Sequence, residues 1–186
     1  MAAMVDLSPL PQMLAAADWR GAEALLRRAA ADRRAPAAVH YNLAKVLVEG
    51  GKPAQAGIWF RRAVTAAPDH AAAWFEYGRW AVDRGDLPLA SAAFAKAAAL
   101  APDDADARRN LGRVALRLGD WPRALAAWQA LGDDPEAAAG RYQAQTELHG
   151  ATMDAARALL RAQRNAAGLQ AITRTARGAL PFDLGG

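Results

Sequence analysis

Residues 71–104 read AAAWFEYGRWAVDRGDLPLASAAFAKAAALAPDD, and this stretch decides the fold. In its first half, apolar side chains recur at helical spacing, so the pattern predicts a helix over residues 71–84. Gly85 and Asp86 then interrupt the pattern, as a helix stop and the N-cap of a following helix do. A second apolar stripe predicts another helix over residues 87–100. The stretch therefore predicts two consecutive helices joined by a tight turn.

The same pattern returns every 34 residues along the chain. Three columns of residues show the spacing: a glycine at the helix stop, an alanine in the second helix, and an aromatic ring four residues after that alanine. Their members are Gly51, Gly85 and Gly119; Ala56, Ala90 and Ala124; and Phe60, Phe94 and Trp128. A period of this length is typical of helical arrays, in which each repeat buries its apolar face against its neighbours. We expect the alanine column at close helix contacts and the aromatic column in the core.

The composition agrees with an all-helical chain. Of 186 residues, 52 are alanine, the best helix former, and none is cysteine, which excludes disulfides and thiolate chemistry. The 20 arginines and 3 lysines give a net charge of only +4, below what a dedicated nucleic-acid binder carries. Residues 1–17 lack the basic start of a signal peptide, and the uncharged stretches are too short to span a membrane. We expect a cytoplasmic protein.

Residues 71–104 resemble the tetratricopeptide repeat, a 34-residue family pattern of small and aromatic positions. The matching positions are Trp74, Tyr77, Gly78, Ala90, Phe94, Ala97 and Pro102. The resemblance implies an all-α fold, a right-handed superhelical stack of antiparallel helix pairs that acts as a protein-binding scaffold. It extends with fewer matches to the repeats on either side, where His40 and Arg108 replace the usual tryptophan.

The repeats predict a division of the chain into an array with two ends. The expected parts are a degenerate N-terminal repeat or cap over residues 1–36, three repeats over residues 37–70, 71–104 and 105–138, a degenerate helix pair or cap over residues 139–172, and a flexible tail over residues 173–186. The end of the chain, including Leu180 to Leu184, is expected to follow a capping helix as a tail. An alternative is that it docks into a groove and causes self-association.

Residues for catalysis, cofactors or metals do not come together in the sequence. His40, His70 and His149 are far apart and show no metal-binding spacing, and solvent or cap roles are the alternative. The turn at residues 50–53 lacks the upstream glycine and the Ser or Thr of a phosphate loop. It is expected to be a turn between two helices, with Pro53 at the start of the second. Acid pairs such as Asp133-Asp134 fall at expected helix starts, where carboxylates cap free N–H groups. We therefore expect no enzyme, no cofactor and no metal site.

The resemblance places a concave groove on the first helix of each repeat. The expected groove residues are Tyr41, Asn42, Lys45, Phe75, Glu76, Arg79, Arg109, Asn110, Arg113 and Arg117. Arginines at 109, 113 and 117 lie at i, i+4 and i+8, so they share one ridge of a helix. Together with the lysine at 45 and the arginine at 79 they form a row of positive charge, which favours a ligand that carries carboxylates. The alternative is an ordinary solvated face in an arginine-rich protein.

Some members of the family hold a C-terminal carboxylate with a lysine- and asparagine-rich clamp. This chain has Tyr41, Glu76 and Asp106 where that clamp needs Lys, Asn and Lys, so the resemblance does not extend to it. Glu76 also disfavours wholly acidic ligands.

The sequence thus predicts a non-enzymatic scaffold that binds a peptide or protein segment, in part acidic, in this groove. An alternative is a regulatory module related to the front part of bacterial sulfotransferases or glycosyltransferases, without the catalytic half. Nucleic-acid binding is a third and weaker alternative, because lysine is scarce and basic and aromatic residues alternate only in the groove.

Overall fold

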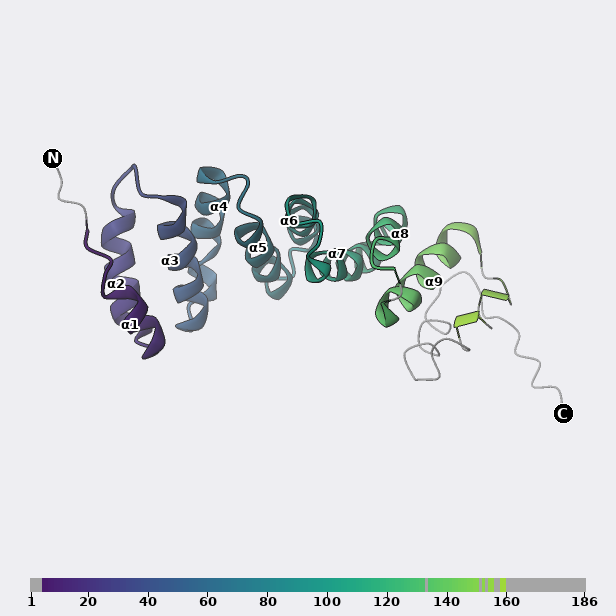
Figure 1. Cartoon of the computed structure of the whole chain (residues 1–186), viewed down its shortest axis with the longest axis horizontal. Helices are drawn as coiled ribbons and strands as arrows, with labels where there is room; N and C mark the ends of the chain where they lie inside the picture. Colours follow the sequence, from purple (N-terminus) through teal and green to yellow (C-terminus); the bar gives the residue numbers. More distant parts are fainter. Residues whose placement is uncertain (1–4, 133, 151, 153, 156–157, 160–186) are drawn as a thin grey trace. The chain divides into compact units, whose positions relative to one another are not determined.

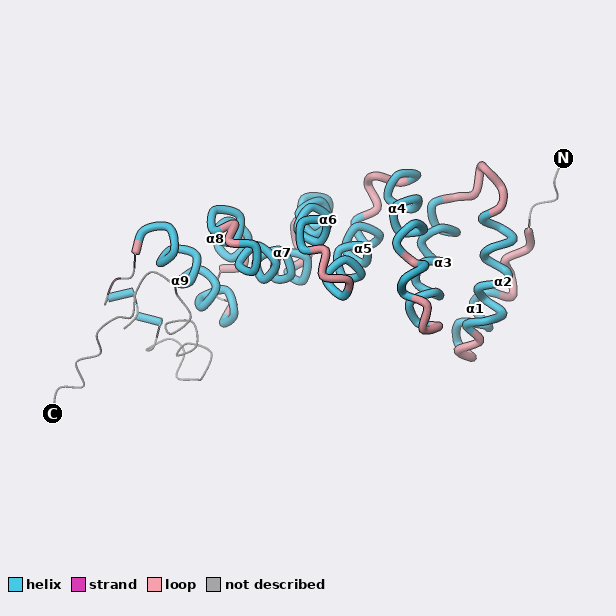
Figure 2. The backbone as a smooth tube through the Cα atoms, turned by 180° about the vertical axis from the view of Figure 1, so that it is seen from behind, coloured by secondary structure: helices cyan, strands magenta, loops and turns pink. Residues whose placement is uncertain are grey.

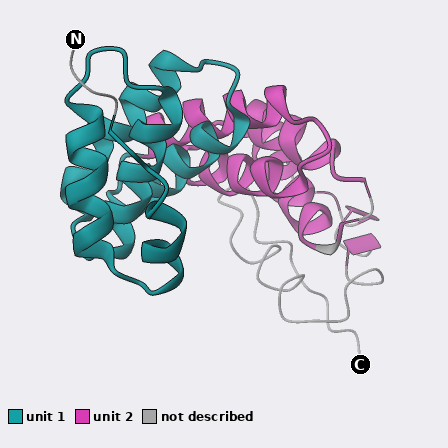
Figure 3. Cartoon of the chain, turned by 60° about the vertical axis from the view of Figure 1, so that its left-hand side comes forward, with its two compact units in different colours: residues 1–86 teal, residues 87–186 magenta. Residues whose placement is uncertain are grey.

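The structure is a computed structural model that describes residues 5–132, 134–150, 152, 154–155 and 158–159. Within this part of the chain the regular elements are helices, and no strand occurs (Figure 2). The expected all-α class is thereby confirmed. The chain divides into two compact units, residues 1–86 and residues 87–186 (Figure 3).

In the first unit, successive helices pack against one another along the chain (Figure 1). The elements are α1 (Leu10–Ala15), α2 (Trp19–Ala30), α3 (Ala37–Glu49), the 3-10 turn η1 (Pro53–Gln55), α4 (Gly57–Ala66) and α5 (Ala71–Asp83). Helix α3 contacts both α2 and α4, so it forms the middle of this unit.

The second unit follows the same rule of neighbouring helices. Its elements are α6 (Leu87–Leu100), α7 (Ala105–Leu118), α8 (Trp121–Gln129) and α9 (Pro135–His149). Helices α7 and α9 also touch directly, so the first helices of two successive repeats lie next to each other here. Half of residues 139–172, where a degenerate helix pair or cap is expected, and all of the expected tail 173–186 lie outside the described residues.

The predicted columns lie in the core. The alanines at 56, 90 and 124 are fully buried, and the rings of Phe60, Phe94 and Trp128 are at most 1% exposed. Small residues are needed where large rings fill the space between helices. This is clearest at Gly112, where a Cβ atom would lie 2.4 Å from the indole of Trp128. The interpretation of the aromatic column as core rather than as a cofactor site is confirmed.

Helix ends also follow the sequence signals. Asp104 caps α7 by accepting hydrogen bonds from the backbone N–H groups of Asp106 and Ala107, and Asp134 caps α9 in the same way. His70 is likewise a cap, because its Nδ1 accepts from the N–H of Ala73 at 3.2 Å. These contacts confirm the capping role expected for Asp104, Asp134 and His70.

One helix start differs from the sequence pattern, which placed it at Pro53. The residues from Pro53 form a 3-10 turn, and α4 begins only at Gly57. The carbonyl of Pro53 accepts both from the N–H of Ala56 at 3.1 Å and from the indole of Trp80 at 2.7 Å. The indole of Trp80 also lies where a Cβ of Gly57 would be. The repeat pattern has no role for Trp80. Its position accounts for the later start of α4.

Candidate functional site

In the first unit, the expected groove residues on α3 and α5 surround one carboxylate. Glu76 Oε1 lies 3.1 Å from Lys45 Nζ and 3.4 Å from Arg79 NH1. The Glu76 side chain is 18% exposed and that of Arg79 is 57% exposed. Two cations therefore share one acid, and this surface keeps an excess of one positive charge.

Apolar and amide groups lie on the same two helices. Tyr41 packs its ring 5.3 Å from that of His70. Burial, with a smaller contribution from the charge of Glu76, raises the pKa of Tyr41, so its phenol stays neutral at physiological pH and can donate a hydrogen bond. Asn42 on α3 and Phe75 on α5 are half-buried. The surface thus offers a ring, an amide and a phenol next to paired charges.

In the second unit, the arginine ridge on α7 ties this helix to α9. Arg109 donates from Nε and NH2 to Asp134 Oδ2 at 2.9 and 2.7 Å, and from NH1 to Asp106 Oδ1 at 2.7 Å. The hydrogen bonds from Arg109 are the main reason that the pKa of Asp134 is lowered. Because Asp134 is also the N-cap of α9, Arg109 supports the start of that helix.

The next arginine of the ridge makes a second tie. Arg113 donates from Nε and NH2 to the two carboxylate oxygens of Glu136, at 2.6 and 2.5 Å, which is the bidentate geometry of a strong pair. Asn110 turns its amide back to the carbonyl of Asp106 at 2.9 Å. Arg117 is exposed and forms no ion pair with any described residue.

Sequence reasoning located the arginines but missed their partners. Asp134 and Glu136 follow Arg109 and Arg113 by 25 and 23 residues, at the start of the next first helix. The repeat period could have indicated these partners. In an array of period 34, the start of the first helix of one repeat lies beside the first helix of the preceding repeat. The same reasoning applies to Lys45, whose partner Glu76 was itself among the expected groove residues.

Among the described residues, no group of His, Asp and Glu could hold a metal ion. Over the same residues, no helix is both long and apolar enough to cross a bilayer. What these surfaces provide is paired charge, amides and rings, which are groups that recognise a polypeptide.

The fold defines a class, namely a repeat protein built from successive helix pairs. The sequence pattern of the family described as Tetratricopeptide repeat matches residues 14–71, 62–105, 75–138 and 110–169. The chain belongs to the tetratricopeptide repeat family. This family supplies protein-interaction modules, so the chain is an interaction scaffold in this general sense.

Solved structures show the same fold at low sequence identity. YrrB, described as "a TPR protein with an unusual peptide-binding site", has a TM-score of 0.73 and 18% identity, covering 89% of this chain and 91% of that one. MamA has a TM-score of 0.70 and 18% identity, with 94% and 93% covered. Pseudomonas aeruginosa pilF has a TM-score of 0.57 and 19% identity, with 91% and 81% covered. No curated protein matches the sequence significantly.

Proposed function

We propose that this chain is a non-catalytic scaffold that binds a peptide or protein segment, in part acidic, through the groove formed by the first helices of its repeats. The observation that carries the proposal is the display of exposed cations beside rings and amides on α3, α5 and α7. YrrB, which shares the fold, is described as having a peptide-binding site. We place this scaffold in the cytoplasm, in keeping with its lack of cysteine.

The ion pairs determine which ligand suits these surfaces. Arg109 and Arg113 are already held by carboxylates on α9, so a ligand carboxylate would have to compete with them. Arg79 and Arg117 are more available, because Arg79 is mostly exposed and only shares Glu76, and Arg117 has no described acid partner. We therefore expect a ligand with a few carboxylates spaced among apolar and cationic residues rather than a wholly acidic one.

The test is selection of binding peptides from a random library on the full chain. We expect the selected peptides to contain Asp or Glu beside apolar residues. The variant with both Arg79→Glu and Arg117→Glu should then bind them at least tenfold more weakly, because charge reversal replaces attraction by repulsion. These two positions are preferred to Arg109 and Arg113, whose reversal would also break the contacts between α7 and α9.

A matched control reverses two exposed cations that are not among the expected groove residues. These are Arg84→Glu, just after α5, and Lys96→Glu in α6. It changes the net charge by the same amount and should bind the peptides nearly as well as the parent. Selected peptides without carboxylates, or equal losses in both double variants, would contradict the proposal.

A further inference from the structure

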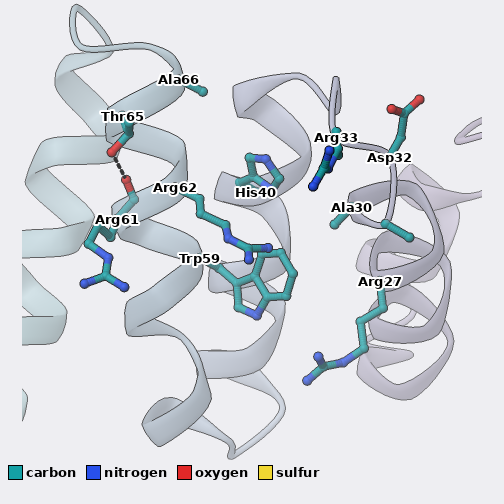
Figure 4. A pocket seen from close by; sticks show the side chains of 11 residues that line it. Arg27, Ala30, Asp32, Arg33, His40, Trp59, Arg61, Arg62, Thr65 and Ala66 are labelled. Carbon is teal, nitrogen blue, oxygen red and sulfur yellow. Dashed lines mark hydrogen bonds between the residues drawn. The ribbon is translucent and has the colours of Figure 1, made fainter.

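A pocket that none of the groove residues lines lies within the first unit. It has a volume of about 700 Å³ and opens between the end of α2, His40 near the start of α3, and α4 (Figure 4). Pockets for small molecules commonly have volumes of about 300–1,000 Å³. The lining residues are Arg27, Ala30, Ala31, Asp32, Arg33, His40, Trp59, Arg61, Arg62, Thr65 and Ala66.

The pocket has an apolar floor built around Trp59. The indole is half-buried, and the ring of His40 is stacked on it with the centroids 5.8 Å apart. The guanidinium carbon of Arg62 lies 4.7 Å from the centre of the indole, a cation–π contact. Alanine side chains complete the lining. Figure 4 shows the side chain of Arg62 reaching toward the indole of Trp59. Its guanidinium has no carboxylate partner among the described residues.

The described residues do not balance the positive charge of the pocket. Arg33 and Arg62 form no ion pair with a described residue, and the one carboxylate on the lining is that of Asp32, whose Oδ1 accepts from the backbone of Arg34 at 2.8 Å. Arg27 differs, because its Nε donates to Glu23 at 2.8 Å. Neighbouring cations without an acid repel each other, and a bound anion would relieve this repulsion.

His40 adds an unsatisfied polar atom. Its Nδ1 is buried and has no hydrogen-bond partner among the described residues. Burial, and then the charge of Arg62, lowers the pKa of His40, so the ring is neutral near pH 7. A buried nitrogen without a partner is costly. Because this atom is closed off from solvent, His40 contributes its ring to the pocket and not a hydrogen bond from Nδ1.

We infer that this pocket binds a small organic anion, namely a flat apolar body that carries a carboxylate or a phosphate. The apolar body packs on Trp59 and the alanines, and the oxyanion accepts from Arg62 and Arg33. Arginine is suited to this because its planar fork matches both carboxylate and phosphate oxygens. The inference is independent of the proposed peptide groove, since the two share no residue.

The test is isothermal titration of the full chain with four probes. Phenyl phosphate and phenylacetate carry both parts of the expected ligand, inorganic phosphate lacks the apolar body, and benzyl alcohol lacks the charge. We expect at least one of the two aromatic anions to bind roughly tenfold more tightly than inorganic phosphate and benzyl alcohol, which is the scale of one hydrogen bond to a charged group. Whichever anion binds more tightly identifies the oxyanion.

Two double variants separate the pocket from general charge. Arg33→Ala with Arg62→Ala should weaken binding of the tighter aromatic anion at least tenfold. Arg20→Ala with Arg28→Ala removes the same charge from exposed positions of α2 that do not line the pocket, and should change binding less than twofold. The groove variant with Arg79→Glu and Arg117→Glu should also bind normally, so a failure of the peptide proposal would not affect this one.

The inference would be overturned by no binding of either aromatic anion, by equal binding of benzyl alcohol, or by equal losses in the two double alanine variants. Binding of inorganic phosphate as tight as that of phenyl phosphate would also overturn it, because the apolar floor would then contribute nothing.

Discussion

Two pairs of arginines, one pair in each compact unit, differ in whether carboxylates bind them. In the second unit, Arg109 and Arg113 on α7 each bind a carboxylate at the start of α9. In the first unit, Arg33 and Arg62 line a pocket and have no ion pair with a described residue. An arginine in such an array thus either links two helices through an ion pair or keeps its positive charge free to bind a ligand. The acids of the neighbouring helix, and not the arginine itself, decide which.

The cores of the two units show a second difference at equal repeat positions. Ala44 of the first unit corresponds to Gly112 of the second, two periods later. In the same way, Phe60 corresponds to Trp128. The larger indole is matched by the smaller glycine. Gly140 on α9 also leaves space for the indole, since a Cβ there would lie 2.4 Å from the ring. Between these two repeats, the gain in ring volume is thus offset by the loss of a methyl group.

The largest effect is expected from breaking this volume match by Gly112→Ala. The new Cβ would overlap the indole of Trp128, and the ring cannot move away easily because Gly140 contacts it as well. Overpacking costs roughly 1–3 kcal/mol, while the better helix propensity of alanine returns about 1 kcal/mol. Because the ring is held from both sides, the cost should lie at the upper end of this range, and we expect the free energy of unfolding, measured by denaturant titration, to fall by about 2 kcal/mol.

The control is the same change together with Trp128→Phe, which reproduces the alanine and phenylalanine of the first unit. Coupled neighbours are non-additive, so the double variant should lose less stability than the two single variants added together. Strict additivity would show that Gly112 and Trp128 do not share one space.

A smaller effect is expected from reversing the charge of the two kinds of arginine. Arg109→Glu would place a third carboxylate beside Asp106 and Asp134 and would remove support from the cap of α9. The loss of stability should exceed that from removing one exposed ion pair, because Arg109 binds two carboxylates. Arg62→Glu breaks no ion pair and should stay within about 0.5 kcal/mol of the parent. Thermal unfolding of both variants checks the difference, and equal losses would contradict it.

Much of the fold could be predicted because it depends on local signals with a period. The bounds predicted for the helix at residues 87–100 agree with α6, and the caps at Asp104 and Asp134 lie where the acid pairs indicated. The prediction that the helix begins at Pro53 was wrong, because the start of α4 depends on Trp80. This residue is far away in the sequence and fits none of the repeat columns.

The candidate sites could be predicted only in part. Residue spacing shows which arginines share a helix face, but an ion pair needs a partner from another helix, and spacing along one helix does not give it. The pocket at Trp59 and Arg62 was missed for the same reason. It is built from α2, α3 and α4 together, and the sequence alone gave Trp59 no role.

The smallest predicted effect concerns the glycine column, in which an alanine stands at the corresponding position of the first repeat. Gly51, Gly85 and Gly119 all have positive φ angles, of 76°, 75° and 71°. One period earlier stands Ala17, with φ of 53°, the one described non-glycine residue in this conformation. Its hydrogen bonds repeat those of the column: the N–H of Ala17 donates to Leu14 at 3.1 Å, and the next N–H donates to Met13 at 2.9 Å. The first repeat thus keeps the turn but has lost its glycine.

We therefore expect Ala17→Gly to stabilise the packing of α1 on α2. Left-handed backbone costs a non-glycine residue roughly 1–2 kcal/mol, whereas glycine adds about 0.5–1 kcal/mol of unfolded-state entropy to be lost. The net gain of about 0.5 kcal/mol should slow amide hydrogen exchange in residues 10–15 about twofold. The matched control is Ala16→Gly, where φ is −84° and no relief of strain is available, so exchange should become faster. If both variants speed exchange equally, the strain at Ala17 does not limit the stability of the first repeat, and the missing glycine is not what distinguishes it from the later ones.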